Sequence, residues 1–142
     1  MKASRKFIEH TADILFQAEA PSLKELFEQC GLALEESQLE LSNVSQKEEK
    51  LITGKHKDID RLLFDFLDDL LFYKDSEQLI FSGFNVIITK KEGEYHLKCK
   101  ALGEKINRKK HEEKVDVKAI TMHLFEVKKI KDGWKAQVLI DI

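Results

Sequence analysis

The sequence predicts a compact α+β domain in which mostly antiparallel strands pack with two main helices. Two stretches have the apolar spacing of amphipathic helices, and most of the rest alternates apolar and polar residues with the period of two that marks strands. Several strands in the second half follow one another closely, and Asp132-Gly133 is a strong hairpin turn between two of them. Because consecutive hairpins pair antiparallel, this order favours α+β over a doubly wound parallel sheet.

Size and composition indicate a single globular domain spanning residues 1–142. The 142 residues are enough to bury a core, and 42% are hydrophobic and 35% charged. The net charge of −2 and the pI near 6.2 argue against a protein that coats nucleic acid, since such domains have a pI above roughly 9. No apolar run approaches the ~20 residues needed to span a bilayer, and no signal peptide opens the chain. We therefore expect a cytoplasmic protein with no membrane partner.

The first half of the chain contains both helix signals. Residues 5–20 alternate as one or two strands, and Pro21-Ser22 ends this pattern. Ser22 and Glu25 form a capping box for a helix that continues at helical spacing to about Ser37. The single helix face that carries Cys30 is apolar, so this thiol is expected to be buried and free.

A second strand and helix follow. Residues 46–53 fit a polar strand that Gly54 ends. Asp58 or Asp60 can cap the next helix, which is expected to run to about Tyr73. Its apolar stripe is wide enough for a central helix covered by sheet on more than one side. The stripe consists of Leu62, Leu63, Phe66, Leu67, Leu70 and Leu71.

The second half is predicted to be mostly strands. Cys99 alternates with apolar residues on one of them, so it is expected to be a second buried free thiol. The two successive strand–helix–strand segments suggest a diverged duplication, although no residue-level repeat is visible. The expected segments are a strand at 78–89, a turn at 90–94, a strand at 95–101 closed by Gly103, a charged loop at 104–114, an extended segment at 115–130 and a last strand at 134–140.

A polar stretch, Glu9-His10-Thr11-Ala12-Asp13, interrupts the first strand pattern. Polar residues at such a place mark a bend, a bulge or a site. On these residues alone, a polar turn with Asp13 as a local hydrogen-bond acceptor is favoured, since such turns are common. Because His10 and Asp13 carry groups that can do chemistry, a functional site is the alternative.

The end of the chain has two further unusual features. Lys118 places a cation just ahead of an expected strand, and Asp141 lies beside the carboxylate of Ile142. Two hard oxygen donors suit Ca²⁺ or Mg²⁺ once another carboxylate approaches. The alternative is a frayed, solvated terminus, and spacing alone favours it.

The usual catalytic signatures are absent from the sequence. It has no glycine-rich phosphate loop, no His-x-x-x-His pair and no Cys-x-x-Cys motif, and its five histidines lack ligand spacing. Residues 105–114 form a basic run that could touch RNA or an acidic partner, but such a charged loop is usually only solvated. The aspartates Asp65, Asp68 and Asp69 of the second helix are weak as a metal site.

Taken together, the segments resemble the archease family. The resemblance spans nearly the whole chain, in the order and at the length typical of that family; Phe66 and Met122 are departures that leave the polar residues in place. The matching segments are Glu9-His10-Thr11-Ala12-Asp13, Ser22-Leu23-Lys24-Glu25-Leu26-Phe27, Asp60-Arg61-Leu62-Leu63 through Leu70-Leu71-Phe72-Tyr73, Gly103-Glu104, Val117-Lys118-Ala119-Ile120-Thr121 with His123, and Trp134-Lys135-Ala136 running into Asp141.

The resemblance implies an accessory protein rather than an enzyme. Archeases are small α+β proteins that assist an RtcB-type RNA-splicing ligase by promoting its guanylylation and repeated turnover. By resemblance, Asp13 and Asp141 form an acidic site for a divalent ion (Ca²⁺, Mg²⁺ or Mn²⁺), and Ile142 contributes oxygen. Lys118 matches the functionally important lysine of the family. His10 is expected to act with Asp13, Lys118 and Asp141 in activation of the ligase.

Two other functions remain alternatives. The resemblance also allows a second role, because some members of the family are chaperone-like partners of a tRNA methyltransferase. In that case the partner would be tRNA or the methyltransferase. The chain could also be a metal-dependent phosphoryl-transfer or hydrolytic enzyme, but it lacks an evident nucleophile, nucleotide loop and water-activating histidines. Neither the metal nor the oligomeric state follows from the sequence.

Overall fold

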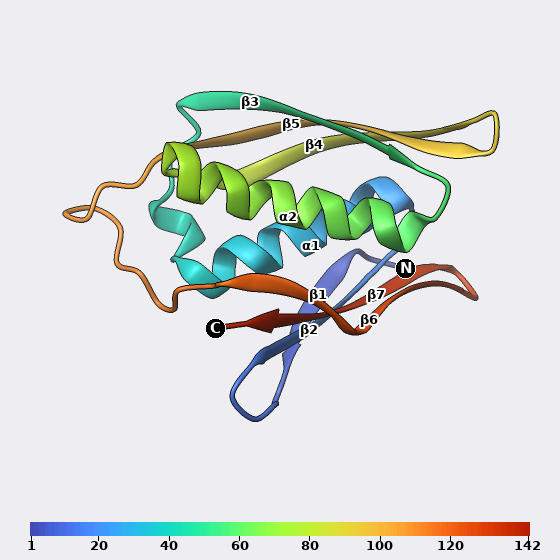
Figure 1. Ribbon diagram of the computed structural model, residues 1–142, viewed down its shortest axis with the longest axis horizontal. Coiled ribbons are helices and arrows are strands. Elements are labelled where there is room, and N and C mark those ends of the chain that lie inside the picture. The colour runs from blue at the N-terminus through green and yellow to red at the C-terminus, as the bar shows by residue number, and fades with distance from the viewer.

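The computed structural model describes residues 1–142 and consists of three layers. Two helices lie side by side between a three-stranded sheet of order β3-β5-β4 and a four-stranded sheet of order β1-β2-β7-β6 (Figure 1). All paired strands are antiparallel, which confirms the α+β prediction. The elements are β1 (Ser4–Ile8), β2 (Ile14–Ala20), α1 (Leu23–Gln38), the 3-10 turn η1 (Leu41–Asn43), β3 (Glu48–His56), α2 (Ile59–Glu77), β4 (Leu79–Lys91), β5 (Glu94–Lys105), β6 (Ala119–Ile130) and β7 (Gly133–Asp141).

The helix layer is the hydrophobic centre of the molecule. Apolar residues of α1 and α2 pack against the inner faces of both sheets and form one cluster of 27 buried residues. Phe66 of α2 contacts Phe27 of α1 and Phe84 of β4, with ring centroids 5.8 and 5.9 Å apart. Burying a large side chain contributes roughly 1.5–3 kcal/mol, so this shared core couples the three layers into one unit.

The first helix begins where the capping box predicts. Ser22 accepts a hydrogen bond from the Glu25 backbone N–H at 3.2 Å, and its hydroxyl contacts the Glu25 carboxylate at 3.0 Å. A cap of this kind stabilises a helix by about 1 kcal/mol. The second helix begins after Asp58, whose side chain makes no capping hydrogen bond. It continues four residues past Tyr73 and ends at Gln78, which adopts a positive φ of 57°.

Both glycines that were expected to end strands lie inside them instead. Gly54 belongs to β3, where a Cβ would come within 3.2 Å of Leu62 of α2. Gly103 belongs to β5, where a Cβ would overlap the backbone at Ile80 and Phe81. These glycines therefore allow close approach of a neighbouring element, rather than marking a chain turn.

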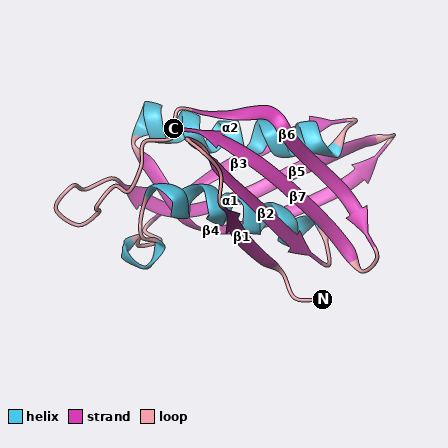
Figure 2. Ribbon diagram, turned by 90° about the horizontal axis from the view of Figure 1, so that it is seen from below, coloured by secondary structure: helices cyan, strands magenta, loops and turns pink.

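The extended segment predicted from Val115 is also shorter in the structure. Its regular strand begins only at Ala119, and residues 115–118 are loop. Val117 is nevertheless buried in the core, which accounts for the apolar pattern that suggested a strand. The Asp132-Gly133 hairpin is confirmed, and it joins β6 to β7, which lie side by side (Figure 2).

The two strand–helix–strand segments differ in connectivity. The segment β2–α1–β3 links the two sheets, whereas β3–α2–β4 begins and ends in the same sheet. The topology therefore adds no support to the suggested duplication.

Neither helix combines the length and apolar character of a membrane span.

Both cysteine thiols are buried and free. Burial raises the pKa of Cys99 to about 12 and raises that of Cys30 even further above its usual range. Only the thiolate is an effective nucleophile, so we expect both to react with a thiol reagent orders of magnitude more slowly than in the unfolded chain. A time course of Ellman's reagent, with and without denaturant, measures this. Fast reaction of either thiol in the native protein would show that its surroundings open readily.

Candidate functional site

The polar loop between β1 and β2 closes a hairpin at one end of the four-stranded sheet. Phe7 pairs with Phe16 and Ile8 with Leu15, so the two strands separate after Ile8 and rejoin at Ile14. Within the loop Ala12 adopts a positive φ of 68°. Because the left-handed conformation costs a non-glycine residue roughly 1 kcal/mol, the loop holds a defined shape rather than a simple continuation of either strand.

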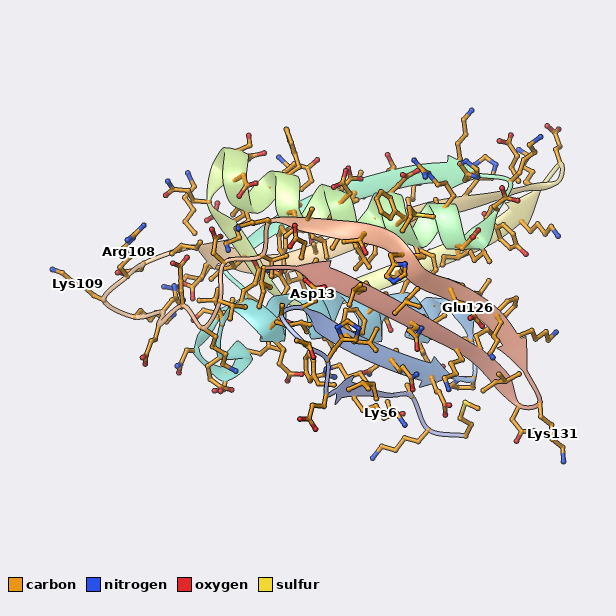
Figure 3. All side chains as sticks on the ribbon, turned by 60° about the horizontal axis from the view of Figure 1, so that its bottom comes forward. Lys6, Asp13, Arg108, Lys109, Glu126 and Lys131 are labelled. Carbon is orange, nitrogen blue, oxygen red and sulfur yellow. The ribbon has the colours of Figure 1, made fainter.

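The register of the sheet brings Asp13 and Asp141 to the same place. Ile14 pairs with Ile140, so one further step along both strands sets Asp13 opposite Asp141. In Figure 3, Asp13 lies beside the C-terminal end of β7. The register thus places Asp13 and Asp141 at the same end of the sheet, although 141 − 13 = 128 positions separate them in the chain.

Lys118 reaches the same sheet end from the third strand. Its backbone N–H donates a 2.8 Å hydrogen bond to the carbonyl oxygen of Asp141, and Ala119 pairs with Asp141. Lys118 is exposed and forms no ion pair, whereas Ile142 is half-buried against the core. Figure 1 shows the β1–β2 loop, the start of β6 and the C-terminus together at this end. Asp13, Lys118, Asp141 and Ile142 are named the sheet-end cluster below.

His10 faces a hollow next to the cluster rather than Asp141. The hollow, of about 620 Å³, lies between the β1–β2 loop and the end of α1. His10 and Asp13 line one side, and Glu36, Glu40 and Lys114 line the other. Lys114 approaches the Glu40 carboxylate at 3.8 Å. His10 therefore adjoins the cluster through Asp13, and the same hollow contains the carboxylates of Glu36, which pairs with Arg5, and Glu40. Sequence reasoning did not single these out because they lie at the end of α1 and just after it.

The cluster's oxygen donors fit a divalent ion only in part. Asp13 and Asp141 are hard carboxylate ligands, of the type that Ca²⁺, Mg²⁺ and Mn²⁺ prefer. The structure contains no group of three or more His, Cys, Asp or Glu side chains arranged to hold a metal. An ion here would need the Ile142 oxygen, water or oxygens from a partner. Mg²⁺ sites with one or two carboxylates completed by phosphate oxygens are of this kind.

A wide bulge in β6, which sequence analysis missed, lies beside the cluster. Four residues, 122–125, lie between Thr121 and Glu126, where the paired stretch of β7 contains only Val138. Phe125 turns inward and packs on Phe64 of α2 at 5.7 Å. Met122 and Leu124 remain 47% and 42% exposed, and Leu124 has a positive φ of 60°. No local turn signal marks this segment, so its strained, exposed leucine was not predictable.

The basic run at 105–114 has two parts. Lys110 and His111 are bound to Glu104, whereas Arg108 and Lys109 lie at the exposed tip of the loop (Figure 3). Glu104 accepts hydrogen bonds from Lys110 and from the Ser45 N–H, each at 2.7 Å, and contacts buried His111 at 3.0 Å. Burial opposes ionisation of Glu104, but these hydrogen bonds outweigh it and hold its pKa at about 2. Arg108 and Lys109 project from the tip of the loop (Figure 3). The expectation of a wholly solvated loop is wrong at His111, because Glu104 and Asn43 bind its ring.

The fold and the sheet-end cluster place the protein in a class of small three-layer α+β proteins that carry two carboxylates and a lysine at one end of a sheet. Comparison with known proteins identifies the family. The model of the Archease protein family matches residues 6–142, and the chain belongs to that family.

Sequence and structural relatives cover nearly the whole chain. Protein archease of Pyrococcus abyssi is 43% identical over 94% of this chain and 95% of its own length. Protein archease of Methanosarcina acetivorans is 37% identical over 96% and 94% of the two chains. The solution structure of protein 1598 from Methanobacterium thermoautotrophicum has a TM-score of 0.87 and 38% identity, covering 97% of this chain and 98% of that one.

Proposed function

We propose that this protein is a cytoplasmic accessory factor that activates an RtcB-type RNA ligase, promoting its guanylylation and repeated turnover in tRNA splicing or RNA repair. The observation that carries the proposal is the convergence of Asp13, Asp141 and Lys118 at the ends of three adjacent strands. Membership of the archease family supports the choice of partner. No catalytic role of its own is assigned to the protein.

Charge explains how such a cluster can act on a partner. Asp13 and Asp141 would hold a divalent ion (Ca²⁺, Mg²⁺ or Mn²⁺), which when bound supplies positive charge between the carboxylates and the ligase. Lys118 is exposed next to them and can pair with a phosphate or carboxylate of the ligase–nucleotide complex. Because the cluster sits at a sheet end rather than in a cleft, it can be presented to another protein's active site. His10 borders the cluster through the adjacent hollow.

Multiple-turnover RNA joining tests the proposed function. RNA with a 2′,3′-cyclic or 3′-phosphate end is incubated with GTP, divalent metal and a limiting amount of a cognate ligase. With this protein present, product is expected to exceed the ligase concentration many times. Product formed without ligase would instead favour a phosphoryl-transfer enzyme. Stimulation of a tRNA methyltransferase but not of the ligase would favour the chaperone-like alternative.

The β6 bulge is proposed as part of the ligase contact surface. Its exposed Met122 and Leu124 lie in β6, which begins directly after Lys118, so a protein reaching the cluster would cover them. Leu124→Asn removes the apolar side chain and places a residue there that tolerates positive φ. We expect unchanged or slightly higher thermal stability and about tenfold weaker ligase binding.

Isothermal calorimetry with the ligase measures the binding change. Leu51→Asn is a matched control, because Leu51 is 56% exposed on the opposite sheet. Equal affinities for the wild type and the Leu124 variant would remove the bulge from the contact surface.

A further inference from the structure

The outer face of the three-stranded sheet carries a concentration of unpaired positive charge. This sheet lies above both helices, and nothing covers its outer side (Figure 1). Ile52, Val86 and Cys99 point inward and are buried, so the alternating residues between them face solvent. These outward residues, here called the open face, are Leu51, Thr53 and Lys55 of β3, Asn85, Ile87, Thr89 and Lys91 of β4, and His96, Lys98 and Lys100 of β5.

The two central lysines of the open face, Lys98 and Lys100, have no acidic residue directly opposite them, whereas Lys91 lies opposite Glu94 at the end of the sheet. Lys98 lies opposite Thr53 on one side and Ile87 on the other, and Lys100 lies opposite Leu51 and Asn85. Neither forms an ion pair, and the same is true of Lys55 and Lys91. Lys98 and Lys100 are two residues apart on one strand and on the same face, so their Cα atoms are only about 6.8 Å apart.

Such an arrangement is unusual for a protein with a net charge of −2. Opposite charges across strands would stabilise an exposed sheet, and like charges side by side do not. Lys98 and Lys100 of the central strand β5 are therefore better explained by binding of an anionic ligand than by a contribution to the stability of the fold.

The open face is also hollowed along this row. One hollow of about 640 Å³ is lined by Thr53, Lys55, Thr89, His96 and Lys98, and a second of about 280 Å³ is lined by Leu51, Asn85 and Lys100. Ile87 and Lys98 border both hollows, which makes them one continuous track across the strands.

We infer that the open face binds single-stranded RNA. Lysines would contact phosphates, the threonine and asparagine side chains would contact ribose hydroxyls, and unstacked bases would lie on Ile87, Leu51 and His96. Ile87 and Leu51 are 60% and 56% exposed, so apolar surface is available beside the charges. A single strand is favoured over an A-form duplex because a duplex keeps its bases stacked and paired, so they could not lie on the exposed apolar side chains. The choice of RNA over single-stranded DNA rests on the proposed function.

Fluorescence anisotropy with a labelled single-stranded RNA of about 12 nucleotides tests this inference. We expect saturable binding with a Kd on the order of 10 μM at about 50 mM salt, and roughly 20-fold weaker binding at about 200 mM if three phosphates are contacted. Lys98→Glu/Lys100→Glu should weaken binding at least about tenfold. The control Lys6→Glu/Lys131→Glu makes the same charge change on two exposed lysines, one in β1 and one in the β6–β7 turn (Figure 3), and should bind like the wild type.

Several results would overturn the inference. They are absence of saturable RNA binding by the wild type, equal loss in both double variants, loss only in Arg108→Glu/Lys109→Glu at the loop tip, and tighter binding of an oligoglutamate peptide than of RNA at the same salt. Single-stranded DNA of the same sequence, if preferred, would count against RNA as the ligand. Lys98→Glu/Lys100→Glu should still stimulate ligase guanylylation without RNA, because its residues lie on the far sheet. Failure of ligase activation is therefore distinguishable from failure of RNA binding.

Discussion

Asp141→Asn is expected to abolish stimulation of the ligase while leaving the protein folded. The substitution keeps the shape of the side chain and removes its charge, so a cation at the sheet end loses half of its side-chain carboxylates. Asp141 is exposed and forms no ion pair, and its backbone carbonyl, which accepts from Lys118, is unchanged. We expect a melting temperature within about 2 °C of the wild type, because surface substitutions usually change stability by less than about 0.5 kcal/mol.

Asp13→Asn and Lys118→Ala should behave in the same way for related reasons. Asp13 lies opposite Asp141, and one exposed lysine contributes little to stability. Both aspartate variants should also lose Ca²⁺ or Mn²⁺ binding in calorimetric titrations, a readout that does not depend on the ligase. The matched control is Asp132→Asn, an exposed aspartate at the opposite end of β7. Variants that fold, melt normally and still activate the ligase would disprove the site assignment, and unfolding of all three would make these residues structural.

Glu35→Gln is expected to stabilise the protein above neutral pH. Glu35 is fully buried in α1 and accepts a hydrogen bond from the Phe81 N–H at 2.7 Å. Burial raises its pKa from 4.5 to about 8, although the hydrogen bond from Phe81 and the charge of Lys74 act in the opposite direction. Lys74 itself binds Gln38 at 2.7 Å and lies 3.7 Å from Asp116.

The raised pKa fixes the direction of the pH dependence. Between pH 4.5 and 8 the folded protein retains a proton that the unfolded chain has released, so the free energy of unfolding falls as pH rises through this window. Glutamine stays neutral and its oxygen can still accept from Phe81, while its NH₂ group replaces the oxygen that accepts the longer, 3.3 Å hydrogen bond from Gln38. Near pH 8 the variant should exceed the wild type by on the order of 3 kcal/mol, or about 10 °C in melting temperature, and the difference should vanish near pH 4.5.

Denaturant unfolding across pH 4–9 measures this effect, with Glu48→Gln as an exposed control. Parallel pH profiles for Glu35→Gln and the wild type would show that Glu35 is ionised in the folded protein.

Glu104 acts in the opposite direction: its pKa of about 2 gives stability that is lost as pH falls below about 4.5. The combined contribution of these two carboxyls to stability is therefore greatest near pH 4.5.

Local signals made most of the secondary structure predictable. Ser22 and Glu25 define the start of α1 through contacts within one turn, and alternation located the strands. Gly54 and Gly103 were misread because a glycine inside a strand and one that ends it look alike in sequence. Their reason is a neighbouring element, Leu62 in one case and the β4 backbone in the other, which only the tertiary structure shows.

The sheet-end cluster was expected from family resemblance, and residue spacing alone favoured a polar turn and a frayed terminus. Register between β2 and β7 decides whether Asp13 meets Asp141, and a shift by one residue would send their side chains to opposite faces. The β6 bulge and the buried His111 were missed for a similar reason. Phe64 holds the bulge and Glu104 holds the histidine, and each contact involves residues assigned to other segments.

Formation of the covalent guanylylated ligase is the most direct measure of the proposed function. Labelled GTP, divalent metal and a cognate RtcB-type ligase are combined without RNA, with and without an equimolar amount of this protein. We predict faster guanylylation in its presence, and no acceleration by Asp141→Asn. Identical guanylylation rates with and without the wild-type protein, at concentrations that saturate binding, would contradict the proposed function.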